Sequence, residues 1–168
     1  PSFENKINIH IGGMYGDAQA TANRWINAWM TLSENLKKRL VIENDDKPSM
    51  WSVQMLYDYF HTVIGIPITF DYFHHSFHQD GLTEEEALHL AATTWPEGIT
   101  QVTHYSESRA LEQEEPNIRP QAHSDYCKQP ISTYGLDIDI MLEAKAKENA
   151  LFESIKINKK VLDESNRR

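Results

Sequence analysis

The sequence predicts an α/β fold built on a parallel sheet, and three observations lead to this prediction. Short apolar runs rich in β-branched residues recur along the chain, amphipathic helical patterns lie between the first three of them, and successive runs are about one βα unit apart. The length of 168 residues is enough for a domain with a substantial core. We therefore expect residues 1–168 to form a single domain.

Five runs are the expected strands of this sheet. They are Ile7-Asn8-Ile9, Leu40-Val41-Ile42, Ile66 to Phe70, Ile99 to Thr103 and Ile138 to Leu142.

The first expected helix follows the first strand. Asp17 is a suitable N-cap, and the apolar positions after it have the i, i+3, i+4, i+7 spacing of one helix face. These positions are Ala22, Trp25, Ile26 and Trp29.

Two more helices are expected from their end signals. Gly65 suits the left-handed position after a helix, and it closes a stripe made by Val53, Leu56, Tyr57, Phe60 and Ile64. Thr83 with Glu86 has the spacing of a capping box, and the chain then runs into Ala87, Leu88 and Ala91.

The pattern breaks after the fourth strand. Residues 105–135 are rich in Ser, Pro, Glu and Gln with only a weak helical signal near 108–115, and long irregular segments inside compact domains are usually functional. A final helix near residues 144–163 is expected to turn Leu151, Ile155 and Leu162 inward.

Composition limits the class of protein. Hydrophobic residues make up 40% and charged residues 24%, which predicts an ordered globular chain. No apolar run approaches the roughly 20 residues of a membrane-spanning helix, so no membrane partner is expected. Cys127 is the only cysteine, which excludes an internal disulfide and favours a cytoplasmic location.

The formal net charge of −9 argues mildly against a protein that grips DNA mainly through its phosphates. Two interpretations of the excess acid remain open. It neutralises bound divalent cations, or it only keeps the surface soluble, and charge alone favours the second.

Each expected strand is followed directly by a residue that can bind a metal. These residues are His10, Glu43, Asp71, His104 and Glu143. Because Asp, Glu and His make up about one residue in five, five such hits would arise by chance on the order of a few times in ten thousand. In a parallel α/β barrel the C-terminal ends of the strands meet on one face, so the five side chains are expected to share a rim with divalent cations.

Further histidines lie near this rim. His74 is three residues after Asp71 and can turn back toward it, whereas His75 and His78 either contact a metal or substrate or belong to a solvated loop. His123 lies in the irregular segment. His61 and His89 fall on helices and are expected at the surface.

Six blocks, in order, resemble the UV damage endonucleases, a family related to the endonuclease IV type of abasic-site nuclease and to the xylose-isomerase-like TIM barrels. The blocks are "NIHIGGMYGD" (8–17), "RLVIENDD" (39–46), "GIPITFDYFHH" (65–75), "THYSES" (103–108), "AHSDY" (122–126) and "MLEAKAKE" (141–148). The resemblance implies an incomplete TIM barrel that contains strands 4 to 8. It also implies incision of UV-damaged double-stranded DNA immediately 5′ of the photoproduct.

The resemblance also assigns roles to residues. His10 and Glu43 would hold one metal, and Glu43 would bridge to a second. The second metal would be held by Asp71, His104 and Glu143, and a third would be served by His74 and His123. Glu43 and Glu143 would be the catalytic carboxylates.

The expected cofactors are up to three divalent cations. Mn²⁺ is the first choice, with Zn²⁺, Mg²⁺ or Co²⁺ as alternatives, and mixed imidazole and carboxylate ligands suit Mn, Fe or Zn better than Mg or Ca. The family typically carries a lysine two residues before the histidine that matches His104, where this chain has Val102.

Three residues are expected to contact DNA. Tyr105 and Ser106 follow His104, and Lys145 lies just beyond Glu143. The alternatives are polar residues of a strand-to-loop connection and an ordinary helix lysine.

Two other functions remain open. A metal-dependent sugar isomerase or epimerase would share the carboxylates and histidines at the strand ends, but would not need His74 and His123. A truncated form of the nuclease family would be inactive, or would need a second chain or a homo-oligomer to supply the missing barrel units. In such an open barrel, Ile9, Val41, Ile68 and Ile140 or their neighbours are expected to be exposed.

Overall fold

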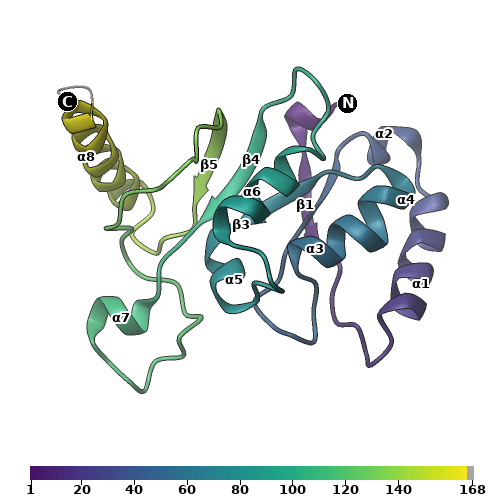
Figure 1. The fold of residues 1–168 in the computed structure, drawn as a ribbon, viewed down its shortest axis with the longest axis horizontal. Coiled ribbons are helices and arrows are strands. Elements are labelled where there is room, and N and C mark those ends of the chain that lie inside the picture. The colour runs from purple at the N-terminus through teal and green to yellow at the C-terminus, as the bar shows by residue number, and fades with distance from the viewer. Residues whose placement is uncertain (166–168) are drawn as a thin grey trace.

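The computed structural model describes residues 1–165, with side chains described through Lys160. Within this part of the chain five strands form one parallel sheet in the order β1-β2-β3-β4-β5. The strands are β1 (Ile7–His10), β2 (Leu40–Glu43), β3 (Ile68–Asp71), β4 (Gln101–Tyr105) and β5 (Ile138–Leu142). The predicted parallel α/β arrangement is confirmed, and the sheet formed by these residues is open, with β1 and β5 at its edges (Figure 1).

Helices lie mainly on one face of the sheet. They are η1 (Phe3–Asn5), α1 (Ala18–Met30), α2 (Glu34–Lys37), α3 (Val53–Leu56), η2 (Tyr57–His61), α4 (Thr62–Ile64), α5 (Tyr72–Phe77), α6 (Glu84–Ala92), α7 (Arg109–Gln113) and α8 (Glu148–Ser165). The segment from α3 through η2 to α4 is continuous, with a π-helical turn in its middle. Figure 1 shows α1, α3, α4 and α6 together, and α8 apart from them beyond β5. None of the helices described in residues 1–165 combines the length and apolar character needed to span a membrane.

The predicted helix ends are confirmed. The Asp17 carboxylate accepts a hydrogen bond from the Ala20 N–H at 2.9 Å and caps α1. Thr83 and Glu86 form a complete capping box at the start of α6. Gly65 has a φ of +69° after α4, a conformation that glycine adopts without a steric penalty.

The main core lies between the helices and one face of the sheet. Ile42 and Ile68 are fully buried there with Leu56, Phe60 and Leu88 from the helices. This packing holds the strands in register, and therefore fixes the positions of the residues at their C-terminal ends.

The opposite face of the sheet carries a smaller apolar cluster. Val41 and Val102 pack there against Trp95, whose indole N–H donates to the Ile68 carbonyl at 2.8 Å. The expectation that Val41 and Ile68 would be exposed is therefore wrong. Val41 is covered by this cluster, and Ile68 faces the helices.

The expectation for the buried face of α8 is wrong, because a different stripe of this helix is buried. Leu151 and Ile155 are 43% and 52% exposed, whereas Ala150 and Ser154 are buried. Asn158, one turn further, accepts a hydrogen bond from the Ile131 N–H at 2.9 Å. Small and polar residues therefore make the contacts of this helix. The side chain of Leu162, which was also expected to point inward, lies outside the described residues.

Candidate metal centre

The predicted ligands lie together at the C-terminal ends of the parallel strands. His10, Glu43 and Asp71 are the last residues of β1, β2 and β3, His104 is the second-last residue of β4, and Glu143 directly follows β5. In the register of the sheet His10 is paired with Glu43, and Asp71 with His104. β1, β2 and β3 therefore end one residue later than the apolar pattern indicates and β4 ends two residues later, whereas β5 ends as expected. Four of the five ligands belong to the sheet itself.

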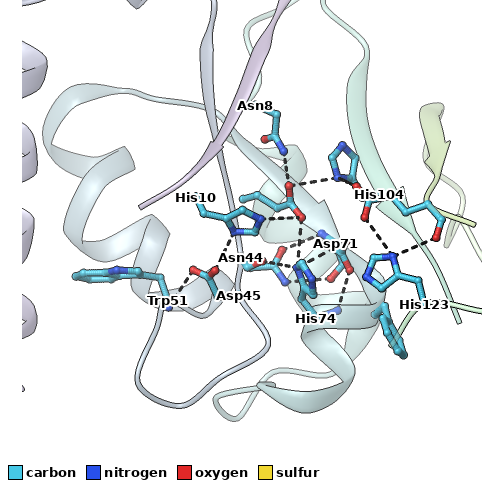
Figure 2. Close-up of polar contacts among 12 residues, drawn as sticks. Asn8, His10, Asn44, Asp45, Trp51, Asp71, His74, His104 and His123 are labelled. Carbon is cyan, nitrogen blue, oxygen red and sulfur yellow. Dashed lines mark hydrogen bonds and ion pairs between the residues drawn. The ribbon is translucent and has the colours of Figure 1, made fainter. Parts of the chain in front are cut away.

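Glu43 is the central residue of the site, because His10, His74 and His104, which are labelled in Figure 2, all lie close to its carboxylate. Its side chain is 3% exposed, and its Oε2 atom accepts a hydrogen bond from the Asn8 side-chain amide. Around it the structure forms two groups whose potential ligand atoms lie within 4.8 Å of one another. Glu43 belongs to both groups.

The first group consists of His10, Glu43 and His74. The Oε1 atom of Glu43 lies 3.7 Å from Nε2 of His10 and 3.3 Å from Nδ1 of His74. His74 is positioned by Asp71, whose carboxylate caps α5 by accepting the His74 N–H at 2.7 Å. The "YFHHSF" stretch is thus a short helix and not a loop.

The second group consists of Glu43, Asp71 and His104. Nδ1 of His104 lies 3.2 Å from Oε2 of Glu43 and 3.0 Å from Oε1 of Glu143. Glu143 is therefore adjacent to this group, and its backbone N–H donates to the Tyr105 carbonyl at 2.9 Å, which holds it beside β4.

His123 joins the site from the irregular segment. Its Nδ1 atom lies 3.1 Å from the Glu143 carbonyl, and its ring centroid is 6.4 Å from that of His74. Phe73 packs edge-on against the ring. His74 and His123, 49 positions apart in the sequence, therefore lie side by side at the site, as predicted.

Three polar residues of the site were missed by sequence reasoning. Asp45 is buried and its Oδ1 atom lies 2.8 Å from Nδ1 of His10, so it orients that ring. Asn44 exchanges hydrogen bonds with the backbone of Asp71 at 2.8 and 3.0 Å. Asn8 contacts Glu43. Asn44 and Asp45 directly follow Glu43 in "IENDD". Their position next to an expected ligand could have indicated that they belong to the site.

Electrostatic coupling shifts the pKa values of the ligands. Burial disfavours the charged form of Glu43, but hydrogen bonds from His104 and His74 outweigh this effect and hold the pKa of Glu43 well below its usual range. Burial also disfavours charged His74 and His104, yet the neighbouring carboxylates raise their pKa values to about 9 and about 10. Burial raises the pKa of Asp71 to about 7.

These residues fit a divalent metal site. Among the described side chains, the buried Asp71 Oδ2 atom has no hydrogen-bond partner, although Asp71 belongs to the second group. Buried polar atoms are nearly always satisfied, so this oxygen points to a partner of another kind. Mixed carboxylate and imidazole donors match Mn, Fe and Zn.

The three expected DNA-contacting residues differ in accessibility. Lys145 is exposed, and its backbone N–H donates to the Ser124 carbonyl at 3.0 Å, so it lies in a turn before α8 and not on a helix. Ser106 is buried, and the Tyr105 hydroxyl donates to Glu107 at 3.2 Å. Contact of DNA with these residues stays a prediction.

A cavity of about 700 Å³ adjoins this region. It lies between α5 and the segment after β4, and its aromatic wall consists of Tyr72, Phe73, Phe77 and Tyr105. Phe73 links this wall to His123, so the cavity opens beside the metal-ligand groups and not over them.

The structure also shows the surroundings of His75 and Val102, two residues discussed from the sequence. His75 is buried, so the alternative that it belongs to a solvated loop is wrong. Val102, at the position of the family's usual lysine, packs in the small apolar cluster with Val41 and Trp95.

Comparisons with known proteins support one family. The profile of the UV-endonuclease UvdE family matches residues 1–167. The chain belongs to the UvdE family. A UV-damage endonuclease of Schizosaccharomyces pombe is 37% identical over 86% of this chain and 24% of its own length. UV DNA damage endonucleases of Clostridium perfringens and Bacillus pumilus are 30% and 31% identical over 95% and 90% of this chain.

A solved structure agrees with this assignment. The crystal structure of SacUVDE is similar with a TM-score of 0.76 and 34% identity, over 93% of this chain and 52% of that chain. The TIM-barrel type of the fold is therefore confirmed. The chain spans 24% to 48% of the length of the three curated UvdE relatives above.

Proposed function

We propose that this UvdE chain carries the metal-binding part of a DNA repair endonuclease, which incises the DNA backbone 5′ to UV photoproducts with the help of divalent metals. The observation that carries the proposal is the position of Glu43, which is shared by two ligand groups, the second of which contains the buried Asp71 oxygen without a hydrogen-bond partner. Relatives named UV-damage endonucleases in fungi and bacteria support the DNA substrate.

The proposed ligands follow from the two groups. His10, Glu43 and His74 hold one cation, and Glu43, Asp71 and His104 hold a second, with Glu143 beside it. This differs from the assignment by resemblance, because His74 groups with His10 as well as lying beside His123. A third cation at His74 and His123 remains part of the proposal.

The chemistry suits such ligands. Hydrolysis of a phosphodiester needs a hydroxide near neutral pH and stabilisation of the charge on the attacking and leaving oxygens, and bound divalent metals supply both. The chain's residues position the groups: Asp45 orients His10, and the Glu143 carbonyl orients His123. Mn²⁺ is the proposed native metal. Glu43 and Glu143 are the proposed catalytic carboxylates, and Lys145 the proposed phosphate contact.

The sugar isomerase alternative has less support. It does not need His74 and His123 at the site, and these two rings lie 6.4 Å apart beside Glu143. The partner-requiring alternative keeps a specific observation in its favour, because β1 and β5 are open edges within residues 1–165.

An incision assay tests the proposed function. A 5′-labelled duplex with one photoproduct is incubated with the chain and Mn²⁺, alone and with a second chain that supplies the preceding βα units. We expect one cut immediately 5′ of the photoproduct, its loss with EDTA, and its loss in Glu43→Gln. Glu34→Gln, which changes an exposed carboxylate on α2, should cut normally.

Metal titration separates binding from activity. Glu43→Gln should lower the number of Mn²⁺ ions bound, because the carboxylate is proposed to serve two ions. An undiminished stoichiometry would contradict the shared role. Absence of cutting in both assay formats, with Mn²⁺ shown to be bound, would contradict the endonuclease proposal.

A further inference from the structure

Tyr15 has a backbone conformation that side chains rarely adopt, in the loop that joins β1 to α1. Its φ is +52° and that of Gly16 is +79°, and the Asp17 N–H donates to the Met14 carbonyl at 3.0 Å. Residues 14–17 therefore form a turn of type I′, in which Gly, Asn and Asp predominate at the central positions. A tyrosine there strains the backbone.

The fold gains little from this strain. The Tyr15 side chain is 86% exposed, and its ring lies over Gly13, with Cζ 3.8 Å from the position that a Cβ on Gly13 would take. Within residues 1–165 its hydroxyl makes no side-chain hydrogen bond. Tyr134, also at positive φ, differs because its hydroxyl donates to Glu84 at 2.9 Å and its ring packs against the core.

The loop that carries Tyr15 is held firmly by its neighbours. The Met14 N–H donates to the Ser49 carbonyl at 3.0 Å, and the Thr21 hydroxyl donates to the Met14 carbonyl at 2.9 Å. The backbone on the N-terminal side of Tyr15 is therefore fixed.

The same loop is linked to the metal centre. The indole N–H of buried Trp51 donates to the Gly12 carbonyl at 2.8 Å, and the Trp51 carbonyl accepts the Asp45 N–H at 2.8 Å. Asp45 in turn holds His10, and Figure 2 shows Trp51, Asp45 and His10 in succession. Because the loop begins directly after His10, Tyr15 lies on the rim of the sheet that carries the ligands.

We propose that Tyr15 is a DNA-contacting residue that stacks on a base exposed by distortion of the duplex. This inference rests on the proposed function, because the DNA would reach Tyr15 when bound at the metal centre. A ring that lies near Gly13 and is otherwise exposed can act as a stacking platform, and such stacking does not depend on base sequence. An intact duplex covers its base faces, so Tyr15 favours distorted DNA. Stacking also suits a chain with a net charge of −9, because it needs no positive charge.

The test uses variants that keep the turn. Tyr15→Asn places a residue favoured at positive φ, so the variant should unfold at the same or a higher urea concentration. Tyr15→Trp keeps an aromatic face. Phe152→Ala removes an aromatic ring that is 59% exposed on α8, away from the rim, and is the matched control.

Fluorescence anisotropy with Mn²⁺ measures binding of two labelled duplexes, one intact and one with a photoproduct. A phosphorothioate at the phosphate 5′ of the photoproduct suppresses cutting. We expect Tyr15→Asn to weaken binding of the damaged duplex by about 5- to 100-fold, and binding of the intact duplex by less than about twofold. Tyr15→Trp and Phe152→Ala should bind as the wild type does, and Mn²⁺ titrations should be unchanged.

The outcomes are distinguishable. If wild type prefers damaged DNA and Tyr15→Asn keeps that preference, the assignment of Tyr15 is wrong while the proposed function stands. If wild type with bound Mn²⁺ shows no preference for damaged DNA, the proposed function is contradicted in this chain, and the assignment of Tyr15 falls with it.

Discussion

At the scale of single residues, the contact between Asp45 and His10 is the informative one. The hydrogen bond at 2.8 Å raises the pKa of His10 and leaves Nε2 directed toward Glu43. A carboxylate that orients a metal-binding histidine typically contributes about 10- to 100-fold to metal affinity. We therefore expect Asp45→Asn to weaken Mn²⁺ binding by about that factor, as measured by isothermal titration calorimetry.

Asp58→Asn is the matched control for this change. Asp58 lies in η2, where its carboxylate accepts a hydrogen bond from the Gln54 side chain, and it contacts none of the proposed metal ligands. Equal Mn²⁺ affinity in wild type and Asp45→Asn would show that His10 is held without Asp45, or that it binds no metal.

Proton binding competes with metal binding at the same residues. The pKa values of His74 and His104 are raised to about 9 and about 10 by the surrounding carboxylates, so both rings are protonated at neutral pH without metal. A metal ligand must lose its proton, so binding releases protons and apparent affinity rises with pH. We expect a steady rise from about pH 6 to about pH 8. Calorimetry in two buffers of different ionisation enthalpy should show net proton release, and a flat profile would contradict the assignment of these ligands.

At the scale of elements, the capping box of α6 is a local feature with a measurable effect. The Thr83 hydroxyl accepts the Glu86 N–H at 3.2 Å, and the Glu86 carboxylate accepts the Thr83 N–H at 2.8 Å. The helix buries Ala87, Leu88 and Ala91 in the main core, so its start affects the whole fold. We expect Thr83→Ala to lower the free energy of unfolding by about 0.5–2 kcal/mol in urea denaturation. Glu85→Gln, in the same turn but outside the box, should change it much less.

The elements that could be predicted are those specified by nearby residues. Capping residues, apolar stripes and strand-ending ligands are each specified by a short stretch of sequence. The structure contains all three kinds of feature. The buried face of α8 depends instead on a distant partner, Ile131, which bonds to Asn158 and selects a different stripe from the apolar one. The contacts of Asn8 and Asp45 likewise exist only because β1 lies beside β2, a pairing that no local pattern specifies.

At the scale of the whole molecule, apolar surface gathers beside an open strand edge. Met141 on β5 is 54% exposed, and Leu151, Phe152 and Ile155 on α8 are 43%, 59% and 52% exposed. A groove of about 600 Å³ lies between β5 and α8. Exposed strand edges and large apolar patches promote association with other chains.

We therefore expect residues 1–168 to self-associate in a concentration-dependent manner in sedimentation velocity. Phe152→Lys with Ile155→Lys places two charges in the apolar patch and should shift the protein toward monomer, because desolvating those charges opposes burial of this surface. Leu111→Lys, at a position that is 82% exposed on α7 and outside this apolar patch, should leave the association unchanged. A wild type that stays monomeric as its concentration is raised would show that the edge and the patch are tolerated in solution. A double variant that associates like wild type would place the contact elsewhere, with the β1 edge as the next candidate because it too lacks a paired strand on one side within residues 1–165.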